Sequence, residues 1–111
     1  MDPGFVMEID ITKKTQRQIY LNKVYEPHIT GYILRNLRDG NVFIDIGANV
    51  GYYTLMASIL VGNKGAVIAF EPEKENFIRL KRNINLNKFT NIICINKAVA
   101  KEKGERVLNI H

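Results

Sequence analysis

Residues 42–54 read VFIDIGANVGYYT. The first five are apolar except Asp45, and the residues that follow include Gly47, Asn49 and Gly51. A short apolar run of this kind predicts a buried strand, and the glycines predict a tight turn into a helix. Glycine allows a sharp turn and a close approach of a ligand to the backbone, and asparagine tolerates a left-handed conformation. We therefore expect this turn to bind a ligand.

The spacing of the glycines favours one kind of ligand. A dinucleotide fingerprint, G-x-G-x-x-G, would place glycine at positions 47, 49 and 52, where the chain has Gly47, Asn49 and Tyr52. The stretch instead fits D-x-G-x-N-x-G, a variant of the loop of S-adenosylmethionine-dependent methyltransferases. The positive helix end would face the methionine carboxylate, and Asp45 would meet the amino group directly or through water. The alternative is a turn without a ligand, which is common in α/β proteins.

A second strand with an acidic end supports the ligand-binding interpretation. Residues 66–70, AVIAF, are apolar and are followed by Glu71 and Pro72. In a doubly wound sheet, the carboxylate at the end of the second strand lies roughly 20 residues after the first loop and can accept hydrogen bonds from the ribose hydroxyls. We expect Glu71 in this role. A helix cap is the structural alternative, because Pro72 suits the first position of the next helix, and the two roles are compatible.

The composition is that of one small folded domain, with 111 residues of which 46% are hydrophobic. No apolar run is long enough to span a membrane and the first residues lack a signal-peptide core, so we expect a cytoplasmic protein. The single cysteine, Cys94, fits a buried apolar position, and two histidines without a His/Cys cluster argue against a structural metal site. The net charge of +5 comes from dispersed basic residues, which favours a solvated surface over a nucleic-acid site.

The rest of the chain predicts further elements. Residues 5–11 fit an edge strand or an arm, and residues 12–22 fit a helix or an extended cover. Hydrophobic periodicity predicts three helices, over residues 29–37 with an end near Gly40, over 52–61, and over 73–88 with a basic outer face. Residues 91–96 and 102–110 read as further strands.

The order of these elements predicts half of a doubly wound α/β sheet. Short loops imply parallel pairing through right-handed crossovers, with local strand order 3-2-1. Strand 42–46 is apolar on both faces, so we expect it to be buried on both sides. A fourth strand for its free edge is not obvious in the sequence, and an open edge invites pairing with another chain. We therefore expect either a fragment of a longer protein or a homo-oligomer.

Three stretches of the chain resemble the N-terminal half of FkbM-family methyltransferases, namely VFIDIGANVGYYTLMAS, AFEPEKENFIRLKRNINLN and NIICINKAVAKEKGERVLNI. The YEP sequence at residues 25–27 resembles that family too, so the resemblance runs from Tyr25 onward. It implies a Rossmann-like fold that binds S-adenosylmethionine. It also implies methyl transfer, usually to a hydroxyl oxygen of a sugar or secondary metabolite.

The loop, the strand ends and the resemblance together give a set of expected cofactor-binding residues. They are Glu26, Asp45, Gly47, Ala48, Asn49, Gly51, Tyr53, Thr54, Glu71, Pro72, Lys97 and Ala98. The resemblance places Glu26 near the methionine moiety, and its alternative is a charge at a helix N-terminus. Lys97 and Ala98 follow the third strand, where such folds often flank the adenine ring. Family members continue with a strand that carries an acidic motif and helps to form the acceptor pocket, and no residue of this chain is assigned as a catalytic base.

The expected organisation is an arm and helical cover over residues 1–40 and a cofactor-binding half-domain over 41–111. The expected chemistry is in-line transfer of the methyl group, with alignment and desolvation supplied by the enzyme. One alternative is the cofactor domain of a tRNA or other RNA methyltransferase, because NINLNK and the basic charge are similar to such enzymes. Another is a non-catalytic remnant that binds a nucleotide or a partner subunit through the open edge.

Overall fold

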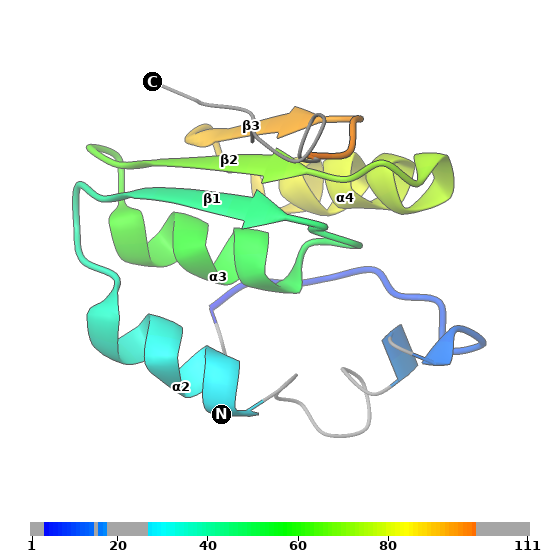
Figure 1. Cartoon of the computed structure of the whole chain (residues 1–111), viewed down its shortest axis with the longest axis horizontal. Helices are drawn as coiled ribbons and strands as arrows, with labels where there is room; N and C mark the ends of the chain where they lie inside the picture. Colours follow the sequence, from blue (N-terminus) through cyan, green and yellow to red (C-terminus); the bar gives the residue numbers. More distant parts are fainter. Residues whose placement is uncertain (1–3, 15, 18–26, 100–111) are drawn as a thin grey trace, which may run out of the picture.

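Three parallel strands form the centre of the structure, a computed structural model that describes residues 4–14, 16–17 and 27–99. The strands are β1 (Val42–Ile46), β2 (Ala66–Phe70) and β3 (Ile92–Ile95). Their order is β1-β2-β3, which confirms the predicted order 3-2-1 and the α/β class (Figure 1). Because all pairs are parallel, the carboxyl ends of β1, β2 and β3 lie at the same edge of the sheet.

Three helices are described, α2 (Pro27–Asn36), α3 (Tyr52–Val61) and α4 (Lys74–Asn87). Helix α3 contacts β1 and β2, whereas α2 packs against α3 and lies farther from the sheet (Figure 1). The predicted bounds of α3 are confirmed. Helix α4 begins later than predicted, because the side chain of Glu73 accepts a hydrogen bond from the Asn76 amide and makes Glu73 the N-cap. Pro72 therefore precedes the N-cap and does not take the first helical position that the helix-cap alternative gave it.

The core lies between the sheet and helices α3 and α4. Leu55 of α3, Ala69 of β2 and Leu80 of α4 are fully buried and belong to one apolar cluster. A second, smaller cluster joins Val61 of α3 to Val67 of β2. Ala69 and Val67 alternate with outward positions along β2, so both helices cover the same face of the sheet.

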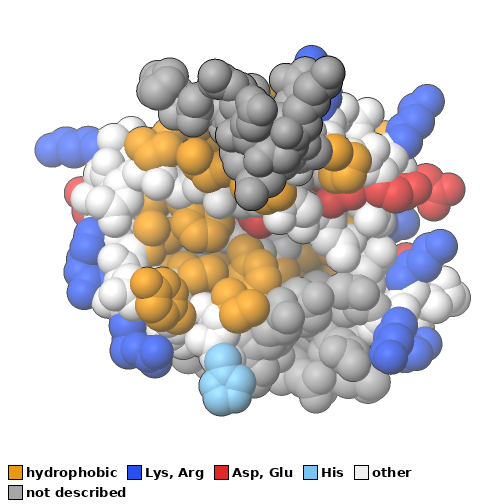
Figure 2. Space-filling view, viewed as in Figure 1, with side chains coloured by type: hydrophobic (Ala, Val, Ile, Leu, Met, Phe, Trp, Pro, Cys, Tyr) orange, Lys and Arg blue, Asp and Glu red, His pale blue; other side chains and the backbone are white. Residues whose placement is uncertain are grey.

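The opposite face of the sheet is exposed along β1. Val42, Ile44 and Ile46 are 61%, 44% and 56% exposed, whereas Asp45 between them is buried. The expectation that this strand is buried on both sides is wrong for the described residues. In this part of the chain, α3 and α4 contact the sheet, and both cover the same face. Figure 2 shows apolar side chains gathered over the region of β1 and the helices below it.

The N-terminal segment is an arm that lies against α4. Phe5 is buried, and its ring meets the edge of Tyr52 with 5.8 Å between the ring centroids. Within residues 12–22, the structure describes 12–14 and 16–17, which include part of a helical turn. The predicted strand over 102–110 lies outside the described residues.

The thiol of Cys94 is half-buried, and burial raises its pKa. Within residues 4–14, 16–17 and 27–99, no helix has the length and apolar character needed to cross a bilayer.

The side chain of Asn91 connects the start of β3 to the end of α3. Its amide donates hydrogen bonds of 2.9 Å to the carbonyls of Ser58 and Gly62, and its oxygen accepts one from the Ser58 hydroxyl. Asn91→Ala should lower the free energy of unfolding by about 1–3 kcal/mol, because it leaves these carbonyls without their partner. Urea unfolding measures this, with Asn85→Ala as a control at an exposed asparagine. Equal midpoints for the two variants would contradict the assignment.

Candidate cofactor site

The turn after β1 is held against the end of β2. The amides of Gly47 and Ala48 both donate to the carbonyl of Phe70, at 2.8 and 2.9 Å. Gly47, Asn49 and Gly51 have φ angles of 75°, 56° and 107°, so alternate residues adopt left-handed conformations. The predicted left-handed conformation of Asn49 is confirmed. The turn is sharp because three of the five residues from 47 to 51 have positive φ angles.

Two of these glycines have different reasons to lack a side chain. A Cβ on Gly47 would meet no atom within 4 Å, so the backbone there faces open space that a ligand can approach. A Cβ on Gly51 would lie 2.9 Å from Leu80 Cδ1. Gly51 therefore allows Leu80 of α4 to pack close to the turn.

Asp45 is buried at the end of β1 and faces α3. It is 8% exposed, and the Thr54 hydroxyl donates a hydrogen bond of 2.7 Å to its Oδ2. Burial raises the pKa of Asp45, the Thr54 hydrogen bond opposes this, and the charge of Glu71 adds to the increase. The two acidic side chains are therefore close enough to influence each other electrostatically.

Glu71 is buried at the end of β2 and joins two backbone turns. One carboxylate oxygen accepts from the Asn49 amide at 2.7 Å, and the other accepts from the Glu73 amide at 2.9 Å. Glu71 thus contacts the backbone just before α4. The structural alternative, in which Glu71 helps to cap this helix, therefore accounts for one of its two hydrogen bonds. Each carboxylate oxygen has a second lone pair, so these bonds are compatible with acceptance from ribose hydroxyls. The ribose role stays a prediction.

The two acidic groups lack a basic partner among the described residues. The ion pairs in this part of the chain join Arg79 and Arg82 to Glu8. A buried carboxylate beside a second carboxylate is costly to ionise, and a bound cation would stabilise both. The two carboxylates therefore suit a ligand with a positive charge, such as an amino or sulfonium group.

The structure brings the end of β3 to the same edge. The side-chain amide of Asn96 donates to the carbonyls of Glu71 and Pro72, at 2.8 and 3.1 Å. Asn96 thereby holds the backbone that leaves β2. The position of Asn96 after a strand does not by itself predict this contact. Pro72, Lys97 and Ala98 are exposed beside it, as a surface binding role requires.

The remaining predicted site residues differ in position. Ala48 and Thr54 are buried, and the Thr54 hydroxyl contacts the Asp45 carboxylate. Tyr52 is the core member of the tyrosine pair, whereas Tyr53 is half-buried, with 5.4 Å between the two ring centroids. Glu26 lies outside the described residues.

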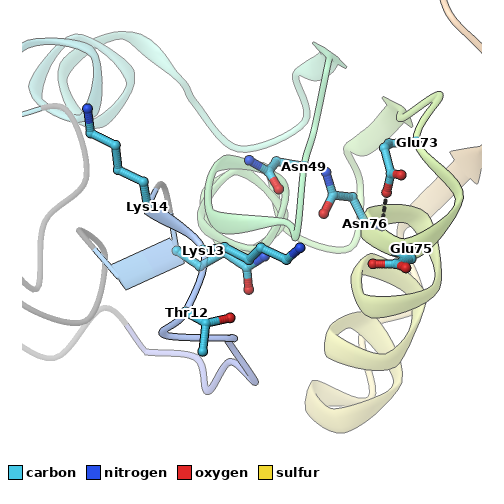
Figure 3. A pocket seen from close by; sticks show the side chains of 8 residues that line it. Thr12, Lys13, Lys14, Asn49, Glu73, Glu75 and Asn76 are labelled. Atoms are coloured by element: carbon cyan, nitrogen blue, oxygen red, sulfur yellow. Dashed lines mark hydrogen bonds between the residues drawn. The ribbon is translucent and has the colours of Figure 1, made fainter.

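A pocket of about 420 Å³ lies next to Asn49, within the range of about 300–1,000 Å³ that is typical of ligand sites. It is lined by Thr12, Lys13, Lys14, Gln16, Asn49, Glu73, Glu75 and Asn76 (Figure 3). Sequence reasoning identified only Asn49 among these. The four arm residues carry no local signal, because they lie far from the loop in sequence and reach it only through the tertiary fold.

The chain matches a known protein family over more than half of its length. The profile described as the methyltransferase FkbM domain matches residues 45–110. The chain belongs to the FkbM methyltransferase family. This confirms the resemblance seen in the loop and in the acidic turn.

Two curated relatives are archaeal methyltransferases. A probable cobalt-precorrin-6B C(15)-methyltransferase (decarboxylating) of Sulfurisphaera tokodaii is 34% identical over 90 residues, which cover 81% of this chain and 41% of that protein. Protein-L-isoaspartate O-methyltransferase 1 of Archaeoglobus fulgidus is 28% identical over 78 residues, which cover 68% of this chain and 36% of that protein. The chain thus spans about two fifths of the length of these relatives.

Solved methyltransferases share the fold. A protein-L-isoaspartate O-methyltransferase superposes with a TM-score of 0.62 and 25% identity, over 68% of this chain and 24% of that one. A SAM-dependent O-methyltransferase from Thermotoga maritima gives a TM-score of 0.60 and 20% identity, over 71% and 32%. The predicted Rossmann-like methyltransferase fold is confirmed, and the chain matches part of it.

The burial of Asp45 predicts a pH-dependent stability. Because its pKa is raised in the folded state, the stabilising contribution of the proton is complete below the unfolded pKa of about 3.9 and is lost as the pH rises through the folded pKa. Asp45→Asn should therefore raise the free energy of unfolding at pH 7, and the difference from wild type should shrink as the pH falls towards 4. Urea unfolding at both pH values measures this. A variant less stable than wild type at pH 7 would contradict the assignment.

Proposed function

We propose that this chain is the cofactor-binding part of an S-adenosylmethionine-dependent methyltransferase that methylates a hydroxyl oxygen of a sugar or small metabolite. The observation that carries the proposal is the pair of buried carboxylates, Asp45 and Glu71, around a left-handed turn that is open at Gly47. Family membership supports the cofactor, since a sulfonium nucleoside with an amino group supplies the positive charge that this site lacks.

Each end of the cofactor has a candidate partner on the chain. Asp45 and the backbone at Gly47 would hold the methionine end, and Glu71 would accept from the ribose. Lys97 and Ala98, after β3, would flank the adenine. When bound, the cofactor supplies an electrophilic methyl group, and these residues contribute alignment and exclusion of water.

The hydroxyl acceptor is supported by the FkbM family rather than by the two curated relatives. Their names indicate methylation of a precorrin carbon and of an isoaspartyl group. Incubation of the chain with radiolabelled S-adenosylmethionine and a panel of sugars, precorrin, isoaspartyl peptide and tRNA tests the acceptor class. Label transfer to sugars supports the proposal, and transfer to any other class alone overturns it.

Gly47 provides the sharpest test of the cofactor site. Gly47→Val should abolish binding of S-adenosylhomocysteine in calorimetry, because the new side chain would fill the open space beside the turn. Gly40→Val is a matched control at the opposite end of β1, since Gly40 also has a left-handed φ, of 86°, and a Cβ there would meet no atom within 4 Å. The two substitutions therefore impose similar backbone strain.

The result separates the two interpretations of the chain. Binding by wild type and by Gly40→Val, with no heat from Gly47→Val, supports the cofactor site. Equal affinity in all three proteins would remove the turn from the site. No binding by wild type would favour the non-catalytic remnant.

We further propose that a second copy of the chain covers the exposed face and free edge of β1. Val42, Ile44 and Ile46 on β1 and Ile93 on β3 expose apolar side chains there, and an open apolar strand edge pairs readily. Ile44→Lys should shift sedimentation towards the monomer, whereas Ile78→Lys, at an exposed isoleucine on α4, should not. A wild-type protein that stays monomeric at high concentration would refute this proposal.

A further inference from the structure

Two asparagine side chains hold the N-terminal arm on α4 as a neighbouring strand would. Asn87 accepts from the Val6 amide at 2.8 Å and donates to the Val6 carbonyl at 2.7 Å. Asn83 accepts from the Glu8 amide at 2.6 Å and donates to the Glu8 carbonyl at 3.1 Å. Residues four apart on a helix rise by about 6 Å, and residues two apart on an extended chain by about 6.6 Å, so the two repeats match.

The side chain of Glu8 strengthens this attachment. One of its oxygens accepts from Arg79 and from Arg82 of α4, each at 3.0 Å. These groups are partly exposed, so the ion pairs add little to stability by themselves. Their main effect is to fix the side of α4 on which the arm lies.

Asn83 also contacts the ligand loop, and Asn87 does not. Its side-chain amide donates to the carbonyl of Val50 at 2.8 Å as well as to Glu8, and the residue is fully buried. Val50 lies between Asn49, which lines the pocket, and Gly51. One buried amide group therefore links the arm, α4 and the ligand loop.

Beyond Glu8, a turn directs the arm into the pocket. The carboxylate of Asp10 accepts from the amide and the hydroxyl of Thr12, at 2.9 and 2.6 Å. The amide of Asp10 donates to the buried side chain of Gln16 at 2.6 Å. This turn places Lys13 and Lys14 on the side of the pocket opposite α4 (Figure 3).

The two lysines give this side of the pocket a positive charge. In the described part of the chain, neither Lys13 nor Lys14 forms an ion pair, and both line the pocket beside Asn49. Two carboxylates, Glu73 and Glu75, line the α4 side of the pocket, and Glu73 is already engaged as the N-cap. Figure 3 shows the Lys13 side chain extending into the pocket, whereas the Lys14 side chain points away from Asn49. An anionic group that enters the pocket from the loop would therefore meet an ammonium group on the arm side.

We propose that the arm is one wall of the cofactor pocket, in which Lys13 and Lys14 bind the carboxylate at the amino-acid end of the cofactor. Asn83 is the positioning residue that couples this wall to the ligand loop. The inference rests on the proposed function, since it assigns a carboxylate partner within the same site. It extends that site to a segment that ends about thirty residues before the loop in sequence.

Two probes isolate the carboxylate contact. S-adenosylhomocysteine carries the amino-acid end, and 5′-methylthioadenosine lacks it. The double variant Lys13→Ala/Lys14→Ala should lose about tenfold in affinity for S-adenosylhomocysteine, as expected for charged hydrogen bonds, and keep its affinity for 5′-methylthioadenosine. Lys64→Ala/Lys81→Ala removes the same charge away from the pocket and should change neither affinity.

The asparagines test the coupling. Asn87→Ala should release the arm, increase hydrogen exchange at the Val6 and Glu8 amides, and weaken S-adenosylhomocysteine selectively. Asn83→Asp keeps the acceptor for the Glu8 amide but loses the donor to Val50. It should therefore weaken both probes, because the loop itself is no longer held.

The outcomes separate this inference from the proposed function. If wild type binds both probes and the lysine double variant binds them as tightly, the arm is not a wall of the site and this inference is overturned while the cofactor site stands. Equal losses for both probes in the lysine variant would also overturn it, because they would indicate a structural effect. If wild type binds neither probe, the proposed function fails as well.

Discussion

The carboxylate of Glu71 holds together two turns that follow different strands. It lies at the end of β2, and its two oxygens accept from the amides of Asn49, after β1, and Glu73, before α4. The parallel pairing of β1 with β2 makes this possible, because it brings both strand ends to one edge. A buried charged acceptor with two amide donors is a strong local constraint. The shape of the turn around Gly47 and the start of α4 both depend on it.

The same arrangement concentrates negative charge where a ligand can reach. Asp45 is close enough to Glu71 for the second charge to raise its pKa, and the Thr54 hydroxyl opposes this by donating to the Asp45 carboxylate. The free chain gains little from the Asp45 carboxylate, because burial and the nearby charge of Glu71 both raise its pKa. A cationic ligand would reverse this cost. With such a ligand, the site would exchange stability of the free chain for affinity, as functional sites commonly do.

The arm gives the site a charge of the opposite sign. Lys13 and Lys14 line the pocket beside the loop because Asn83 and Asn87 hold residues 6 and 8 on α4. A ligand with an amino group and a carboxylate would find acidic groups below the loop and ammonium groups across the pocket. This pairing favours a zwitterionic end over a simple anion or cation. The helix that covers the core is therefore also the support of the pocket wall.

Local patterns in the sequence were enough to predict the central elements. Strands 42–46 and 66–70 and helix 52–61 have the predicted bounds, because apolar runs and glycine turns act over a few neighbouring residues. The left-handed Asn49 follows from the same local chemistry. The acidic residues at the ends of β1 and β2 were also identified, since parallel pairing requires their proximity.

Other features depended on contacts that no local pattern records. Pro72 lies before α4 because the Glu73 side chain caps the helix. Ile44 is exposed because the helices that contact the sheet cover one face only. The hydrogen bonds from the arm to α4 join residues 75 and 81 positions apart. The sequence by itself determined the elements and the acidic groups of the site, because these follow from neighbouring residues. Only the tertiary structure decided which face is covered and that the arm forms a wall of the pocket, because packing brings distant residues together.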